Sequence, residues 1–188
     1  MFIQSEATPN PATLKFIPGK AVLPAGTLDY RSPTDATASP LASSLFGIEG
    51  VEGVFLGQDF ISVTKAETLA WQHLKPAVLG VIMEHYMSGA PVVAGAANSD
   101  AADAEAEDFS ADDQEIVDTI KELIETRVRP AVANDGGDIV FRGFRAGVVS
   151  LSMRGACAGC PSSTATLRNG IENMLKHYVP EVLEVRPV

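Results

Sequence analysis

The sequence predicts an α+β protein made of two small α/β-sandwich-type domains joined by a flexible acidic linker. Its 188 residues are enough for one ordinary domain or two small ones. Composition favours two, because residues 89–109 are rich in alanine, glycine and acidic side chains and show no amphipathic period. Such a stretch cannot bury enough apolar area to offset the chain entropy lost on ordering. We therefore expect an amino-terminal domain at 1–88, a linker at 89–109 and a carboxyl-terminal domain at 110–188.

Short apolar runs separated by turn residues fill the amino-terminal domain. Thr8-Pro9-Asn10-Pro11 and Pro18-Gly19 are turn signals, and Gly57-Gln58-Asp59 joins two runs into a hairpin. The expected elements, in order, are strands at 2–4, 14–17 and about 27–31, a short helix from Ser39 through Phe46, strands at 51–56 and 60–64, and a helix from about Thr68 that is interrupted or restarted at Pro76. Together they make a small α+β domain.

A helix with a continuous apolar stripe opens the carboxyl-terminal domain. Ser110, with Asp113 three residues on, is predicted to form a capping box at its start. The stripe runs toward Pro130, and the helix is expected to end at residues 134–137. Strands at 139–141 and 148–153, a helix with apolar residues from Leu167 to Tyr178, and a last strand at 182–186 complete the domain. The predicted order is αββαβ.

Charge and hydropathy exclude several classes of protein. The formal net charge is −10 and the sequence pI is about 4.7, with no basic stripe, so we expect no binding to nucleic acid or to an anionic membrane surface. No apolar run is long enough to cross a bilayer. Residues 1–6 lack the character of a secretory signal or a transit peptide, which predicts a cytoplasmic protein in a reducing compartment.

Both cysteines lie in one short loop, Cys157-Ala158-Gly159-Cys160, which follows a predicted strand and precedes a predicted helix. Two thiols at this spacing can converge on one metal, but a tetrahedral zinc ion or a cubane iron-sulfur cluster takes about four ligands. The chain therefore supplies half of a site. The other ligands would come from a second copy, from a partner or from small thiols, unless the pair is a redox dithiol.

The start of the following helix favours anion binding at this loop. Pro161 suits the first position of a helix, which places Cys160 near the cap. The positive end of the helix dipole is expected to lower the pKa of the thiols and to favour a bound anion, and Arg154 adds positive charge. The same context suits a thioredoxin-like redox pair. The residues alone thus leave three hypotheses: an iron-sulfur cluster completed by ligands from outside the chain, a thiol-disulfide redox pair and a structural zinc-bridged dimer.

Several segments resemble a known family. In the second domain Arg129-Pro130-Ala131-Val132, Asp135-Gly136-Gly137-Asp138-Ile139 and Gly155-Ala156-Cys157-Ala158-Gly159-Cys160-Pro161-Ser162-Ser163 resemble the signature of the NifU-like C-terminal domain. In the first domain Met1-Phe2-Ile3-Gln4, Thr8-Pro9-Asn10-Pro11-Ala12-Thr13-Leu14-Lys15-Phe16 and Pro18-Gly19-Lys20 resemble the Nfu amino-terminal domain. The two resemblances occur in family order, and the resemblance to the NifU-like C-terminal domain spans the whole second domain of this chain.

The resemblance implies an iron-sulfur cluster carrier in which two cysteine loops bridge one 4Fe-4S cluster. It also implies a homodimer formed through the carboxyl-terminal domain, an upstream cluster donor and apo-protein clients. Ligand roles are carried over only to Cys157 and Cys160. The turn at Asp135-Gly136-Gly137-Asp138 is either a plain helix-to-strand turn or one that lies beside the cluster loop. The chain lacks the presequence expected of a mitochondrial relative, which agrees with the cytoplasmic prediction.

No other catalytic or metal-binding set stands out. The sequence contains no phosphate-binding glycine loop of the P-loop kind and no convincing Ser-His-Asp order, so we expect a protein that is not an enzyme. Imidazole replaces thiolate at some clusters. His73 and His85 lie in the other domain, however, and His177 is a helix away from the loop, so packing or surface roles are expected for all of them.

Overall fold

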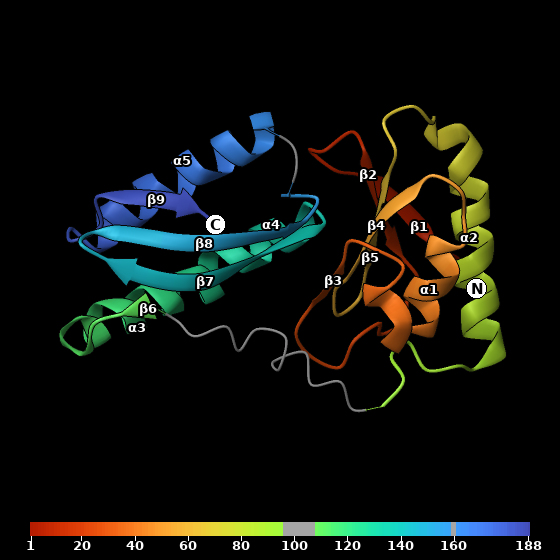
Figure 1. Cartoon of the computed structure of the whole chain (residues 1–188), viewed down its shortest axis with the longest axis horizontal. Helices are drawn as coiled ribbons and strands as arrows, with labels where there is room; N and C mark the ends of the chain where they lie inside the picture. The colour runs from red at the N-terminus through yellow and green to blue at the C-terminus, as the bar shows by residue number, and fades with distance from the viewer. Residues whose placement is uncertain (96–107, 159–160) are drawn as a thin grey trace. The chain divides into compact units, whose positions relative to one another are not determined.

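The computed structural model describes residues 1–95, 108–158 and 161–188 (Figure 1). The chain divides into two compact units, Met1–Asp103 and Ala104–Val188. Both units combine helices with an antiparallel or mixed sheet, which confirms the predicted two-domain α+β fold class. No helix in the described residues is both long and apolar enough to span a bilayer.

A five-stranded antiparallel sheet forms the centre of the first unit within residues 1–95. The strands are β1 (Gln4–Ala7), β2 (Thr13–Ile17), β3 (Leu28–Tyr30), β4 (Val51–Leu56) and β5 (Ile61–Lys65), in the spatial order β1-β2-β5-β4-β3. The predicted hairpin is confirmed, since β4 pairs with β5 in antiparallel register from Val51↔Lys65 to Leu56↔Ile61. Its register follows from alternation, because Val54 and Leu56 point into the core together with Ile61 and Val63.

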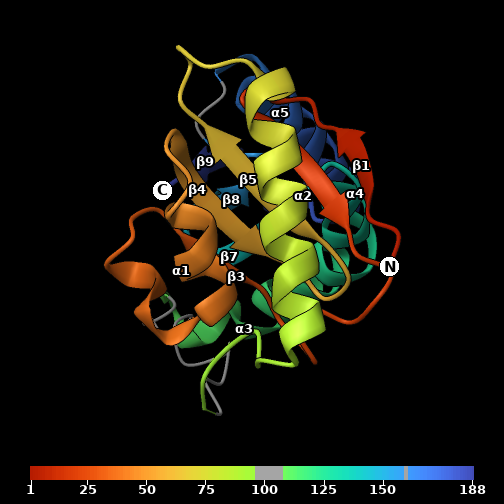
Figure 2. The same ribbon diagram turned by 90° about the vertical axis from the view of Figure 1, so that its right-hand side faces the viewer.

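Helices α1 (Pro40–Phe46) and α2 (Trp71–Ser88) cover one face of this sheet (Figure 2). A short 3₁₀ helix, η1 (Asp35–Ala38), precedes α1. The start of α1 is as predicted: the Ala42 N–H donates to Ser39 Oγ at 3.1 Å, and Pro40 occupies the first turn. The predicted interruption of α2 at Pro76 is wrong. Pro76 lies at an exposed position inside one continuous helix, although proline normally interrupts the interior of a helix.

The second unit has a four-stranded mixed sheet within its described residues, in the order β6-β7-β8-β9. The strands are β6 (Asp108–Phe109), β7 (Gly137–Arg145), β8 (Val148–Gly155) and β9 (Glu184–Pro187). β7 and β8 are antiparallel, whereas β6 and β9 run parallel to their neighbours. The order αββαβ is confirmed with one addition: Asp108 and Phe109, the last two residues of the expected linker stretch, pair with β7.

The helical elements of this unit are η2 (Ala111–Asp113), α3 (Gln114–Leu123), the π-helix η3 (Ile124–Val128), α4 (Arg129–Asn134) and α5 (Pro161–Tyr178). The first helix ends at Asn134 as predicted. The π turn ends at Val128, two residues before Pro130, whose ring would clash with the Thr126 carbonyl in a regular α-helical turn, so the chain widens there. The predicted capping box is wrong, because Ser110 makes no side-chain cap bond and precedes a 3₁₀ turn instead.

Apolar residues of α3, η3 and α5 pack on the sheet to form the core of the second unit. Ile120 and Ile124 contribute from the first helix, and Ile171 and Leu175 contribute from α5. Ile139 and Leu151 are fully buried on the sheet side of this core. This packing fixes the end of β8, from which the cysteine loop leaves, beside the start of β7.

Candidate metal centre

The cysteine loop leaves the end of β8 and leads into α5 (Figure 1). Gly155, the last residue of β8, has φ = +62°, and its carbonyl accepts the Ala158 N–H at 3.1 Å. Thr164 Oγ1, in the first turn of α5, donates to the Cys157 carbonyl at 3.0 Å. These bonds hold Cys157 between the sheet and the helix. Cys160, the second predicted ligand, lies outside the described residues.

Cys157 packs directly against the double-glycine turn that precedes β7. A Cβ atom added at Gly137 would lie 2.6 Å from Cys157 Sγ and 2.7 Å from the Arg154 carbonyl oxygen, distances that a real side chain does not reach. The Ala156 N–H donates to the Gly136 carbonyl at 3.2 Å. The hypothesis that this turn lies beside the cysteine loop is therefore confirmed, and glycine at 137 is what makes the close approach sterically possible.

The thiol of Cys157 is free and only 6% exposed. Burial raises the pKa of Cys157 to about 12, and the carboxylates of Asp135 and Asp138 raise it further. The expected lowering of this pKa by the helix start is wrong, because a helix dipole has a modest effect whereas burial strongly disfavours a thiolate. The apo protein thus holds Cys157 as a neutral thiol, and a metal that binds there must displace its proton.

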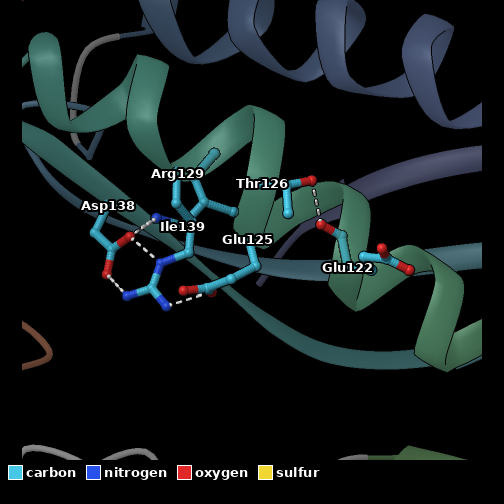
Figure 3. A network of polar contacts seen from close by, with 6 residues as sticks. All are labelled: Glu122, Glu125, Thr126, Arg129, Asp138 and Ile139. Atoms are coloured by element: carbon cyan, nitrogen blue, oxygen red, sulfur yellow. Dashed lines mark hydrogen bonds and ion pairs between the residues drawn. The ribbon is translucent and has the colours of Figure 1, made fainter.

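A charged clamp spans the turn between α4 and β7 (Figure 3). Arg129 Nε and Nη2 donate to the two carboxylate oxygens of Asp138, each at 2.8 Å, while Arg129 Nη1 donates to Glu125 Oε2 at 2.8 Å. The Ile139 N–H donates to Asp138 Oδ1 at 2.9 Å. The hydrogen bond to Asp138 is the main reason that the pKa of Arg129 rises above its usual value. The clamp joins α4 to β7 across the turn that contacts Cys157.

Arg129 and Asp138 belong to the motifs noted in the sequence, but the motifs predicted no role for either residue. The Glu125 and Arg129 pair could have been found, since oppositely charged residues four apart meet on a helix face. The contact of Arg129 with Asp138, the more buried of its two partners, could not have been predicted. Asp138 is nine residues from Arg129 and follows a reversal of the chain, so no periodicity connects the two.

The remaining candidate ligands are not gathered at the loop. His73 and His177 are exposed, and His177 contacts the Tyr178 ring at a centroid distance of 5.0 Å. His85 is 7% exposed in the first unit and lies 5.6 Å from the ring of Tyr86. Among the described residues, no group of three or more His, Cys, Asp or Glu side chains is arranged to hold a metal ion. Packing and surface roles for the histidines agree with this arrangement.

Two family models match this two-domain α+β chain, one in each domain. Residues 3–89 match the family described as scaffold protein Nfu/NifU N terminal, and residues 120–186 match the NifU-like domain. The chain therefore belongs to the Nfu family, as the motifs predicted.

Two relatives and one solved structure illustrate the similarity. The chain is 51% identical over 189 residues to the human protein named NFU1 iron-sulfur cluster scaffold homolog, mitochondrial, with all of this chain and 72% of that protein covered. It is 51% identical over 184 residues to NifU-like protein 4, mitochondrial, of Arabidopsis thaliana, covering 97% of this chain and 64% of that protein. A NifU-like protein from Saccharomyces cerevisiae, whose solution structure is known, is 24% identical with a TM-score of 0.46, covering 50% of this chain and 86% of that one.

The predicted cytoplasmic location is wrong in the light of these relatives, which are named as mitochondrial. The prediction rested on the composition of the first six residues. The chain spans 64% to 72% of the length of the two relatives, so its first residues carry no information about targeting. The reduced state of a free cysteine does not separate one reducing compartment from another.

Proposed function

We propose that this protein is an iron-sulfur cluster carrier that binds one labile 4Fe-4S cluster between two copies through Cys157 and Cys160 and passes it to apo-protein clients. The cluster is cargo rather than a resident cofactor. The observation that carries the proposal is the half-site: the chain has only two cysteines, in one loop, while a cluster of this kind takes four thiolates. The printed names of the relatives, which describe iron-sulfur cluster scaffolds, support it.

The described part of the loop supports transfer as well as binding. Cys157 is held from β8, from α5 and from the glycine turn, so in this proposal it keeps its position while the ligands of the cluster are exchanged. Each copy holds only two of the four cluster ligands. Thiolates of an incoming client can therefore replace them in steps, after an upstream donor has supplied the cluster.

We assign residues 1–88 to the amino-terminal domain, 89–109 to a spacer and 110–188 to the cluster-binding domain, which forms the homodimer. The division between the two compact units falls between Asp103 and Ala104, inside the assigned spacer, which supports the assignment. The amino-terminal domain contains no cysteine and cannot ligate iron through thiolate. Recognition of clients or of the donor is the role that we propose for it.

Anaerobic reconstitution with ferrous iron and sulfide tests the proposal. We expect about four irons and four sulfides per dimer by metal analysis and size-exclusion chromatography, with a brown chromophore. Cys157→Ser and Cys160→Ser should each abolish the cluster. Transfer is measured as the recovery of activity when the loaded protein is mixed with a 4Fe-4S apo-enzyme. A wild-type protein that stays monomeric and free of iron would refute the proposal.

The rival functions predict different outcomes. A thiol-disulfide oxidoreductase would respond unequally to the two serine substitutions, since one sulfur attacks and the other resolves. The raised pKa of Cys157 argues against this residue as the attacking thiolate. A zinc-bridged dimer would retain zinc, without visible colour, after purification from iron-replete cells. Zinc alone would not decide the question, because it also occupies emptied thiolate sites.

A further inference from the structure

The sheet of the second unit carries helices on one face only. α3, η3, α4 and α5 all contribute buried residues to a single core. From the strands, the residues in that core are Ile139, Phe141, Phe144, Val149, Leu151, Met153 and Val185. Because side chains alternate along a strand, the residues between these point away from the core, to a face on which no helix of the described residues packs. We call it the open face.

Four arginines stand on the open face, and they come from three strands. They are Arg142 and Arg145 of β7, Arg154 of β8 and Arg186 of β9. Ser150, in the middle strand, pairs with Gly143, the neighbour of Arg142, on one side and with Arg186 on the other. Because neighbouring strands lie about 4.8 Å apart, the backbones of Arg142 and Arg186 flank Ser150 across a distance of roughly 10 Å.

The open face has the opposite charge to the chain as a whole. The formal net charge of the chain is −10, but the described strands place only two carboxylates, Asp138 and Glu184, beside these arginines. Asp138 is buried and held by Arg129, and Glu184 Oε2 lies 3.5 Å from Arg186 Nη2. The four arginines are separated by other residues in the sequence and form no basic run. Only the pairing of the strands gathers them.

This arrangement suits the binding of carboxylates. All four arginines reach solvent: Arg145 and Arg186 are exposed, and the other two are half-buried. A guanidinium group presents its N–H donors as a planar fork that matches the two oxygens of a carboxylate. Ser150 has a short side chain, so it leaves room between the arginines for a side chain of a ligand and adds a hydroxyl donor.

An acidic segment of a protein is the occupant that this charge pattern fits. The open face attracts negative charge, whereas the rest of the chain repels it. A nucleic acid carries phosphates along its whole length, and a membrane is a wide anionic surface. Either would extend past the four arginines and meet the acidic remainder of the chain. A short acidic segment avoids that repulsion, because its charges end where the open face ends.

The open face reaches the cysteine loop. Arg154 is the residue before Gly155, which ends β8, and the loop begins directly after it. A partner held by Arg154 therefore lies beside the loop that contains the proposed ligands. In the proposed function a client or a donor must approach this loop, so this part of the inference rests on that function. The binding of an acidic segment does not, since it needs no cluster.

We infer that the open face docks an acidic segment of a partner protein beside the cysteine loop, with its four arginines donating to the carboxylates of that segment. Charge complementarity of this kind sets the orientation of a partner and speeds the encounter, and it weakens as salt screens the charges. A docked partner is thus brought to the loop in a defined orientation before any ligand of the cluster changes.

Peptide binding to the full-length apo protein tests the inference. The probe is a fluorescein-labelled peptide of about twelve residues in which glutamate and serine alternate, and its binding is followed by fluorescence anisotropy at low salt. We expect the wild type to bind this peptide, to lose it at high salt, and not to bind the same peptide with glutamine in place of glutamate. In the double variant Arg142→Gln with Arg186→Gln, the dissociation constant should rise about tenfold.

Lys121→Gln with Lys176→Gln is the matched control. It removes the same charge from the same unit, but the two lysines belong to α3 and α5, in the helical layer. This variant should bind the peptide as the wild type does. Circular dichroism checks that both double variants fold. Equal weakening in the two double variants would overturn the inference, because net charge alone would then explain the binding.

Other occupants of the open face give other results. No binding by the wild type would overturn the inference, and so would tighter binding of a single-stranded oligonucleotide or of phosphatidylserine vesicles than of the peptide. Peptide binding that begins only after the acids of residues 100–107 are replaced by amides would also overturn it, since the chain's own acidic run would then hold the face. A wild-type protein that binds the peptide but no cluster would refute the proposed function and support the docking surface.

Discussion

Replacement of Arg129 by glutamine leaves the buried carboxylate of Asp138 without its charged partner. The Asp138 side chain is 4% exposed and the Arg129 side chain 31%, and two hydrogen bonds of 2.8 Å join them. Breaking a buried ion pair costs about 3–5 kcal/mol. Because nearly a third of the Arg129 side chain is in water, we expect Arg129→Gln to lower the free energy of unfolding of the second unit by about 2–4 kcal/mol.

Urea unfolding measures this loss and contains its own control. Far-UV circular dichroism follows both units, while the fluorescence of Trp71, the single tryptophan, follows the first. Arg129→Gln should shift the circular-dichroism transition of the second unit and leave the Trp71 transition unchanged. Asp138→Asn added to Arg129→Gln removes the stranded charge and should restore about 1–3 kcal/mol.

A matched surface substitution sets the scale. Arg186 forms an ion pair with Glu184 at 3.5 Å, and both side chains are about half exposed. Arg186→Gln should change stability by less than about 0.5 kcal/mol. The conclusion that the Arg129–Asp138 ion pair stabilises the turn would be refuted by either of two results. One is an equal loss of stability in Arg129→Gln and Arg186→Gln. The other is a shift of the Trp71 transition in Arg129→Gln as large as that of the circular-dichroism transition.

Three further predictions concern the cysteine loop and the first unit. Gly137→Ala places a methyl group against Cys157 Sγ. It should lower the free energy of unfolding in urea by about 1–3 kcal/mol and slow iron uptake during reconstitution. Uptake at the wild-type rate would contradict the close contact. In apo Cys160→Ser protein, alkylation of Cys157 by iodoacetamide should be slow at pH 8 and rise roughly tenfold per pH unit up to its pKa of about 12; a plateau near neutral pH would show that the thiol is not buried as described. Burial lowers the pKa of His85 below its ordinary value of 6.5, so neutral His85 stabilises the first unit above that pH, and this stabilisation is lost as the pH falls below it. The urea midpoint measured by Trp71 fluorescence should therefore drop between pH 7 and pH 5. His85→Gln should make that drop smaller.

Several elements could be predicted because their determinants are local. The hairpin of β4 and β5 follows from alternation around a short turn, and the start of α1 follows from Ser39 and Pro40. β6 could not be predicted, since a two-residue strand has no pattern of its own and exists only because β7 offers an edge. The π turn before Pro130 was also missed, because the sequence shows that a regular turn is disfavoured but not how the helix adapts.

The chain by itself determined that this protein has two α+β domains of the Nfu family and half of a four-thiolate site. Those conclusions depend on composition, motif order and the number of cysteines, which do not change with folding. Only the tertiary structure decided that Cys157 is a buried neutral thiol, that Gly137 contacts it, and that the ion pair of Arg129 with Asp138 stabilises the adjoining turn. Desolvation and close contact depend on the distance between segments far apart in sequence, and that distance is set only when the sheet and helices pack.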